Sequence, residues 1–291
     1  MMNIGNSISV IRGKREMGTD NKLIDIRGVK KVYKTPVGDV TALTDCTFSI
    51  ERGDFLGMVG PSGCGKTTIL NLIAGFDTVS EGEIYMEGAL VSSATTHLQP
   101  GPDRVVVFQN GALFPWMTNL ANIIFGPVVQ GFMSEKEARE KALEYSDIAG
   151  LTEVLSEYPS FISSGMQRRV EIVRALICDP KILLLDEPFR ALDSVSKALM
   201  HEYLLRLYDR TGKTIMFITH DIDEAVYLAS KIFVMTTRPG RLKTLVRIDS
   251  PRPRNIKDTA STEFLRHKQE IYGLVGEEAR KAFQRGEREL A

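Results

Sequence analysis

Residues 60–67 read Gly-Pro-Ser-Gly-Cys-Gly-Lys-Thr, which fits the phosphate-loop pattern G-x-x-x-x-G-K-[ST]. An apolar run at 54–59 precedes this loop, and a run with helical apolar periodicity at 68–74 follows it. A strand, a glycine-rich loop and a helix in this order direct backbone N–H groups and the positive end of the helix dipole at a polyphosphate. The sequence therefore predicts a nucleoside triphosphate site on an α/β fold.

The loop residues themselves are the first candidate ligands. Lys66 is placed to reach the β- and γ-phosphates, and the hydroxyl of Thr67 is placed to bind Mg²⁺. Cys64 could carry a reactive thiol, because a helix N-terminus lowers a thiol pKa, but we interpret it as a small residue at a permissive position. The candidate nucleotide-binding residues of this segment are Gly60, Pro61, Ser62, Gly63, Cys64, Gly65, Lys66, Thr67 and Thr68.

The composition narrows the class of protein. The 291 residues include 37 Lys and Arg against 37 Asp and Glu, so nothing indicates a nucleic-acid partner or a polybasic membrane anchor. No apolar run approaches the roughly 18 residues of a membrane span. The 3 cysteines lack disulfide or zinc spacing, which fits a reducing cytosol. Residues 1–21 are polar and aperiodic, and we expect them to form a disordered leader.

Short β-like runs dominate the chain from residue 23, and strands alternate with helices from residue 182 onward. We expect strands at 23–32, 40–50, 55–59, 83–86, 104–108, 182–185, 214–219 and 231–235, and helices at 134–149, 164–177, 194–208, 221–229 and 261–283. Ser134 and Glu137 have the spacing of a capping box at the start of one helix. Strands that alternate with helices predict a parallel sheet covered on both faces. We find no internal repeat and expect one set of nucleotide motifs per chain.

A second acidic motif follows another buried strand. Residues 181–188 read Lys-Ile-Leu-Leu-Leu-Asp-Glu-Pro. A central parallel strand reads as a continuous apolar run, and ligands lie beyond its carboxyl end. We therefore expect Asp186 beside the phosphate loop, where it can bind Mg²⁺, and Glu187 in place to accept a proton from the attacking water. A polyphosphate cradle, a metal and a positioned water are the requirements for phosphoryl transfer.

Together with these two motifs, five further segments resemble motifs of the ATP-binding-cassette (ABC) ATPases. The likeness covers residues 22–250. The five segments are Tyr33, Val107-Phe108-Gln109, Ile162-Ser163-Ser164-Gly165-Met166-Gln167-Arg168-Arg169-Val170, Ala191-Leu192-Asp193 and Ile218-Thr219-His220-Asp221. The resemblance implies a phosphate-loop (RecA-like) core with a parallel sheet, an N-terminal antiparallel β-subdomain and an inserted α-helical subdomain at about 110–178. Residues 251–291 are then a C-terminal extension that contains an amphipathic helix.

The resemblance also implies a role for the motif residues. Tyr33 would stack on adenine, Gln109 would contact Mg²⁺ and the attacking water, and His220 would hold the γ-phosphate. The catalytic candidates are then Lys66, Gln109, Glu187 and His220, and the candidate metal ligands are Thr67, Gln109 and Asp186. The implied cofactors are ATP and Mg²⁺.

A second copy of the chain completes the site in this family. Ser163 and Gly165 would present the start of a helix to the γ-phosphate that the other copy binds, and Asp193 would cross the same interface. Two chains then enclose two ATP molecules head to tail. The chain departs from the family pattern at two positions. Ser164 stands where the first glycine of the signature is usual, and Arg190 stands where a small residue is usual.

A finer resemblance is to the ATPase subunits of nitrate, sulfonate and taurine importers. It rests on Phe114-Pro115-Trp116, Gly165-Met166-Gln167, Arg238-Pro239-Gly240-Arg241 and Ser250-Pro251-Arg252-Pro253-Arg254. It implies a subunit on the cytoplasmic face of the cell membrane, with a bacterial inner membrane as the expected setting. The implied partners are integral-membrane permease subunits and a periplasmic or extracellular solute-binding protein. Trp116 is either a core residue or a docking residue for the permease, and we favour docking because aromatic residues are enriched at interfaces.

Other functions remain open at this stage. An exporter has a similar ATPase subunit, although the lack of a fused membrane domain favours an importer. A soluble ABC ATPase that acts on DNA or ribosomes usually has tandem cassettes or a basic face, which this chain lacks. A GTPase or small-molecule kinase leaves the segment 163–165 unexplained.

The predicted terminal helix has an apolar stripe. We expect one face of the helix to be buried, either on its own domain or against a partner chain. The stripe consists of Phe264, Ile271, Val275 and Phe283.

Overall fold

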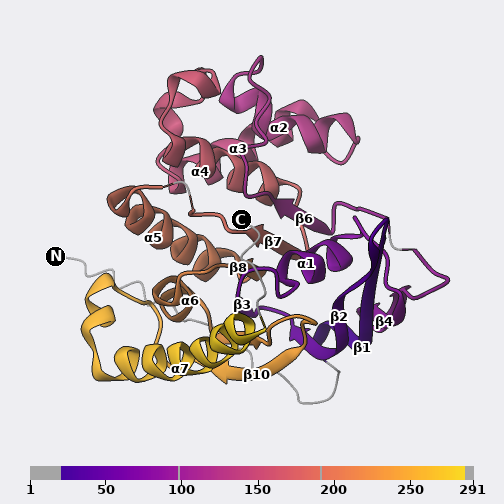
Figure 1. Ribbon diagram of the computed structural model, residues 1–291. Helices are drawn as coiled ribbons and strands as arrows, with labels where there is room; N and C mark the ends of the chain where they lie inside the picture. The colour runs from indigo at the N-terminus through magenta and orange to yellow at the C-terminus, as the bar shows by residue number, and fades with distance from the viewer. Residues whose placement is uncertain (1–20, 98, 191, 286–291) are drawn as a thin grey trace.

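The computed structural model describes residues 21–97, 99–190 and 192–285 (Figure 1). The predicted leader, except for residue 21, and Ala191 lie outside the described residues. Two sheets form the body of the molecule. The first is antiparallel, as predicted for the N-terminal part, and its strands in spatial order are β2 (Gly38–Glu51), β1 (Lys22–Thr35), β4 (Glu81–Met86) and β5 (Ala89–Ser92).

The second sheet confirms the predicted parallel core. In spatial order its strands are β10 (Leu242–Arg247), β9 (Lys231–Met235), β3 (Phe55–Val59), β8 (Thr214–Ile218), β7 (Ile182–Asp186) and β6 (Arg104–Val107). The neighbours from β9 to β6 pair in parallel, whereas β10 pairs antiparallel with β9. Every residue of β3 and β8 is buried, because helices and the first sheet cover both faces of a central parallel strand.

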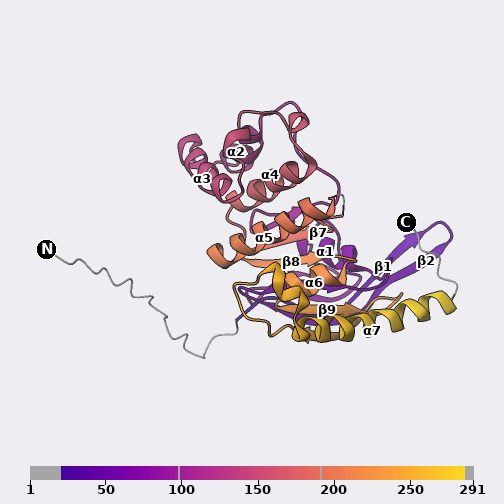
Figure 2. The same cartoon turned by 90° about the vertical axis from the view of Figure 1, so that its left-hand side faces the viewer.

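The helices form two groups. Three of them pack near the second sheet: α1 (Lys66–Ala74), α5 (Ser194–Thr211) and α6 (Ile222–Leu228). Three more gather in a lobe at one end of the molecule (Figure 2): α2 (Asn119–Val129), α3 (Glu135–Ile148) and α4 (Ser164–Ile177). The lobe also holds short 3₁₀ turns at Thr152–Val154 and Pro159–Phe161. The capping box of Ser134 and Glu137 is present with both of its hydrogen bonds. Within the described residues, every helix is too short or too polar to cross a bilayer.

The sequence did not predict two strands, β5 and β10, and one α-helix, α2. Helix α2 contains Gly126 and Pro127, and these two residue types have the lowest helix propensities. It forms because Thr118 caps it and because the buried side chain of Asn122 donates to the carbonyl oxygens of Phe114 and Thr118. It then packs on α3 and α4. Tertiary contacts therefore outweigh the local propensity.

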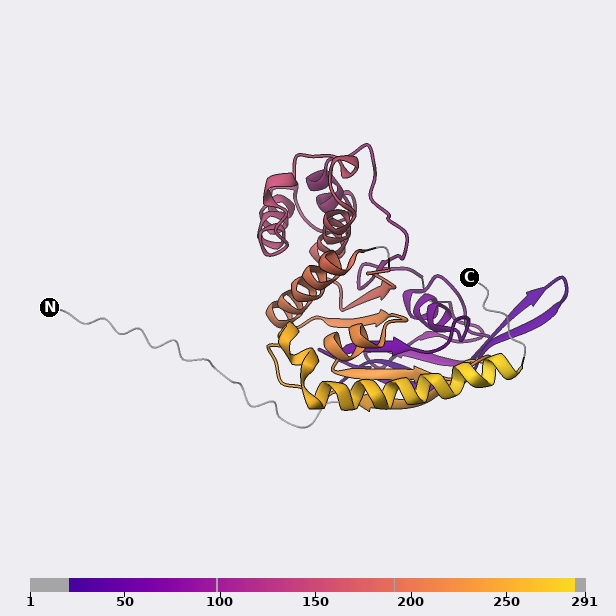
Figure 3. The ribbon, with the colours of Figure 1, turned by 60° about the vertical axis from the view of Figure 1, so that its left-hand side comes forward.

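The last helix, α7 (Thr262–Gln284), lies along α6 and β9 (Figure 3). A 3₁₀ turn at Ile256–Ala260 leads into it. Phe264 and Ile271 are buried and Val275 is half-buried, so the expected buried face is confirmed, and of the two alternatives it packs on its own domain. The expected burial of Phe283 is wrong, because this side chain is 86% exposed. At 3.6 residues per turn it lies about 100° around the helix from Phe264, whereas Glu278 continues the buried face.

We predict that Ile271→Ala lowers the free energy of unfolding by about 2–4 kcal/mol, because the substitution leaves a cavity under α7. Phe283→Ala is the matched control and should change it by less than about 0.5 kcal/mol. Urea denaturation followed by circular dichroism measures both values. Equal losses in the two variants would contradict this account of the buried face.

Candidate nucleotide-binding site

A cavity of about 740 Å³ opens at the N-terminus of α1 and at the carboxyl ends of β7 and β8. Ligands of parallel α/β sheets bind at this edge, because the loops that follow the strands converge there. The residues around the cavity come from strands, helices and loops in both halves of the chain. The sequence-predicted residues that line it are Tyr33, Ser62, Gly63, Gly65, Lys66, Thr67, Thr68, Glu187 and His220.

The phosphate loop wraps around the ammonium group of Lys66. Gly65 is the N-cap of α1 with φ 96, a left-handed conformation that favours glycine, and a Cβ at this position would also crowd the side chain of Leu43. Lys66 is buried, and its Nζ donates to the carbonyl oxygens of Gly60 at 2.9 Å and Pro61 at 3.0 Å. The loop geometry thus fixes a cation at the point where the backbone N–H groups converge.

Cys64 is buried inside the same loop. Its Sγ lies 3.7 Å from Nζ of Lys66. Burial raises the pKa of the Cys64 thiol above its ordinary value, although Lys66 acts in the opposite direction. A raised pKa leaves little thiolate at neutral pH. The geometry therefore supports a packing role for Cys64.

Two oxygen atoms that could bind a metal ion lie close together between the phosphate loop and the acidic motif. The hydroxyl of Thr67 donates to Oδ1 of Asp186 at 3.4 Å. Burial raises the pKa of Asp186, and the neighbouring carboxylate of Glu187 raises it further. A hydroxyl and a carboxylate are ligands that suit Mg²⁺, which usually takes its remaining ligands from phosphate and water. No cluster of three His, Cys, Asp or Glu side chains among the described residues could hold a metal by itself.

The carboxylate of Glu187 lies between two cation-forming side chains. Its Oε1 is 2.6 Å from Nε2 of His220, and its Oε2 is 3.2 Å from Nη1 of Arg190. Burial, followed by the charge of Lys66, lowers the pKa of His220, so the imidazole is neutral at pH 7. Glu187 also has φ 45, a left-handed backbone conformation that costs roughly 1–3 kcal/mol in a residue other than glycine. Such strain is typical of functional sites.

Tyr33 belongs to β1 and lines the same cavity. Its hydroxyl donates to Oδ2 of Asp77 at 2.7 Å, and Nζ of Lys31 lies 4.9 Å from the ring centre. The ring is 37% exposed, so one part of it is available for stacking. The sequence reading missed Asp77, because nothing local connects it with a tyrosine 44 residues away.

Several predicted residues do not line this cavity. The backbone carbonyl of Gln109 accepts from Nη2 of Arg168 at 2.7 Å. Ser163 caps α4, and Asp193 caps α5 through Oδ1. Gly165 is buried in the first turn of α4. Their assigned roles remain predictions, as does that of Asp186, which lies next to the lining rather than in it.

The sequence reading also missed three charged residues that line the cavity: Lys197, Glu224 and Arg238. Lys197 forms ion pairs with Glu224 at 2.8 Å and Asp221 at 3.3 Å. No local pattern marks Lys197 or Glu224. Arg238 belongs to a motif that the sequence had singled out, but only as a mark of resemblance.

Comparisons with known proteins identify the family. The family model described as ABC transporter matches residues 43–190. A nitrate import ATP-binding protein of Synechocystis is 41% identical over 258 residues, which cover 87% of this chain and 94% of that protein. An aliphatic sulfonates import ATP-binding protein of Bacillus cereus is 38% identical over 245 residues, or 84% of this chain and 93% of that protein.

A solved structure adds a three-dimensional match. It is the dimeric structure of a post-hydrolysis state of an ATP-binding cassette bound to ADP and Pi. It has a TM-score of 0.66 and 31% sequence identity, and the match covers 78% of this chain and 100% of that chain.

We predict that Lys66 and Glu187 affect different steps. Lys66→Ala should weaken ATP binding by at least about ten-fold, because it removes the cation held inside the loop. Glu187→Gln should leave the Kd for ATP within about three-fold of the wild-type value and lower turnover by about a hundred-fold or more. Calorimetry and a phosphate-release assay measure the two quantities.

Glu187→Gln should also form a dimer in the presence of ATP, which light scattering detects, and Lys66→Ala should not. An equal loss of nucleotide affinity in the two variants would show that both residues act on binding.

Proposed function

This chain belongs to the ABC transporter family, and on that premise we propose that it is the ATP-hydrolysing subunit of a membrane importer for a small oxyanion or organic solute. The observation that carries the proposal is that the phosphate loop, Glu187 and His220 line one and the same cavity. The relatives named for nitrate and sulfonate import support the direction of transport and the class of solute.

The proposed chemistry follows from the positions of the side chains. Lys66 and the loop N–H groups bind the phosphates. Thr67 and Asp186, which are in hydrogen-bond contact, would hold Mg²⁺, and this ion supplies charge neutralisation on the phosphates when it is bound. Glu187 orients the attacking water and accepts its proton. His220, held neutral and in contact with Glu187, positions the γ-phosphate and the same water.

We propose that the working unit is a head-to-tail homodimer. Within one chain the starts of α4 and α5, marked by Ser163 and Asp193, are not part of the cavity lining. A second copy that presents these residues to the γ-phosphate would complete each site. The dimeric post-hydrolysis neighbour supports this arrangement.

An exposed aromatic surface offers a docking site for the permease subunits. Trp116 is 70% exposed, and its ring centre lies 5.5 Å from that of Phe114. A largely apolar groove of about 410 Å³ adjoins it, lined in part by the stacked rings of Phe76 and Phe108. Arg174 lines this groove and also lies 4.5 Å over the ring of Phe114. Exposed aromatic residues beside an apolar groove are typical of protein interfaces.

The proposal places the subunit on the cytoplasmic face of the membrane, with a periplasmic or extracellular solute-binding protein in the same system. The alternatives are the ATPase subunit of an exporter and a soluble ABC ATPase without a transport role. All three share the nucleotide chemistry and differ in what the ATPase drives.

Measuring transport in cells separates these functions. A strain that lacks this gene should lose uptake of labelled nitrate or of an alkanesulfonate, and the wild-type gene should restore uptake whereas Glu187→Gln should not. Intact uptake with impaired efflux of a solute would support the exporter instead. Normal transport in both directions would favour the non-transport ATPase.

Trp116→Ala tests the docking surface. We expect the ATPase rate of the isolated chain to be unchanged, because Trp116 is not among the residues that line the nucleotide cavity. Uptake should fall by about ten-fold as the permease contact weakens. Tyr272→Ala, at a similarly exposed aromatic residue on α7, is the control and should leave uptake unchanged. Full uptake with Trp116→Ala would remove this residue from the interface.

A further inference from the structure

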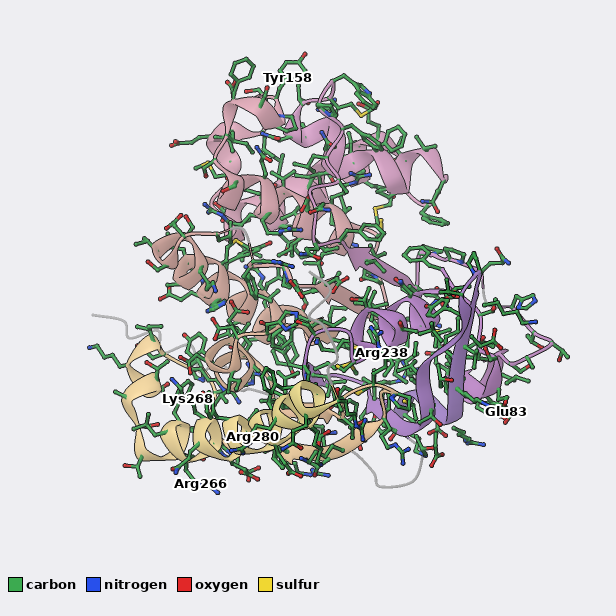
Figure 4. The ribbon with its side chains drawn as sticks, in the orientation of Figure 1. Glu83, Tyr158, Arg238, Arg266, Lys268 and Arg280 are labelled. Carbon is green, nitrogen blue, oxygen red and sulfur yellow. The ribbon has the colours of Figure 1, made fainter. Side chains whose placement is uncertain are left out.

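The turn between β9 and β10 packs directly on the phosphate loop. The backbone N–H of Gly240 donates to the carbonyl oxygen of Ala42 at 2.9 Å, and the N–H of Thr44 donates to the carbonyl oxygen of Gly240 at 2.9 Å. A Cβ at Gly240 would lie 1.8 Å from the carbonyl oxygen of Cys64, so no other residue fits this approach. The turn therefore has a fixed position relative to the loop, and Arg238 is part of it (Figure 4).

Arg238 extends from this turn into the nucleotide cavity. Its Nε donates to the carbonyl oxygen of Gly63 at 3.2 Å, and the side chain lines the cavity. Its Nη2 lies 2.7 Å from the position that a Cβ would take at Gly63. A guanidinium has five N–H donors in a planar fork, so most of them remain available beside the loop.

The charges of the cavity distinguish Arg238 from its neighbours. Of the other lining cations, Arg190 is paired with Glu187, and Lys197 is paired with Glu224. Lys66 and Arg238 are the two lining cations that have no ion pair within the described part of the chain. Both donate to carbonyl oxygens of the phosphate loop instead. A polyphosphate in this loop is therefore met by two uncompensated positive charges.

Helix α7 holds the backbone on both sides of Arg238. The N–H of Thr237 donates to Oε2 of Glu278 at 3.1 Å, and Nη1 of Arg285 donates to the carbonyl oxygen of Arg238 at 3.1 Å. Glu278 is buried, and its Oε1 accepts from Nζ of Lys243 in β10 at 2.9 Å. The C-terminal helix, the turn and the phosphate loop thus form one connected series of contacts.

We propose that Arg238 is a second phosphate-binding cation of the nucleotide site and that α7 positions it through Glu278. This inference rests on the proposed function, because it takes the occupant of the loop to be ATP or ADP. Contact with the loop at Gly63 places the guanidinium near the β-phosphate, since the central N–H groups of such a loop cradle that group. Arginine suits this role because its fork binds two phosphate oxygens at once.

The first experiment measures nucleotide affinity by calorimetry. Arg238→Ala should weaken the binding of ATP and ADP by about ten-fold or more, and Arg238→Lys should recover part of the loss. Arg241→Ala is the matched control, because it removes the same charge from an exposed residue of the same turn that does not line the cavity. The binding of AMP should fall much less, because AMP has no β-phosphate.

The second experiment tests the positioning by α7. Glu278→Ala should weaken ATP binding by about three-fold or more, because the turn loses its anchor and Arg238 loses its preorganised position. Glu277→Ala is the control, since Glu277 also pairs with Lys243 and Lys281 but makes no contact with Thr237 among the described residues. In the Arg238→Ala background, Glu278→Ala should have little further effect.

The outcomes separate the inference from the proposed function. If the wild-type chain binds no ATP, or if Lys66→Ala binds it normally, the proposed function itself fails. If the wild-type chain binds ATP and Lys66→Ala does not, but Arg238→Ala behaves like Arg241→Ala, only the inference fails. Equal losses for ATP, ADP and AMP in Arg238→Ala would mean that Arg238 supports the shape of the loop and does not contact the β-phosphate.

Discussion

The site depends on the parallel pairing of three neighbouring strands, β3, β8 and β7. In this order Met58 pairs with Ile218, and Ile218 pairs with Asp186, so the three strands end at the same level. The phosphate loop follows the first strand, His220 follows the second, and Glu187 follows the third. Side chains more than 100 residues apart therefore converge on one edge of the sheet, as Thr67 and Asp186 do. Any shift in strand register would separate the metal-binding oxygens from the phosphate cradle.

Arg190 and Ser164 are the two positions at which the chain departs from the family pattern. Arg190 pairs with the carboxylate of Glu187, but its own side chain is 64% exposed, so solvent screens the pair and its energy is small. The closer contact of Glu187 is with His220. Ser164 lies in the first turn of α4 and is exposed, while Ser163 serves as the cap. Both departures therefore leave in place the contact between Glu187 and His220 and the contacts of Lys66 with the phosphate loop.

The sequence predicted the features that depend on neighbouring residues. Continuous apolar runs marked the buried strands, and the phosphate loop and acidic motif located most of the cavity. It failed where a distant segment decides the outcome. Strand β10 has only one buried residue, Val246, and exists because β9 pairs with it. Asp77 and Arg238 reach the site through contacts across 44 and 175 residues. The expectation that Phe283 is buried follows from its apolar side chain alone. It is wrong because the buried face of α7 continues through Glu278, a charged residue that a hydrophobic stripe does not include.

The start of α4 explains why one chain makes half of a site. A helix leaves its first four N–H groups without intrahelical partners, and here the hydroxyl of Ser163 accepts from only one of them, that of Met166. The first turn carries no acidic residue, so the positive end of the helix dipole is not neutralised within its own element. In the proposed dimer the γ-phosphate of the other chain supplies that negative charge. ATP binding and dimerisation are then linked, because the contacts that the γ-phosphate makes with the second chain stabilise the dimer alone. Hydrolysis removes the bridging phosphate and with it this contribution.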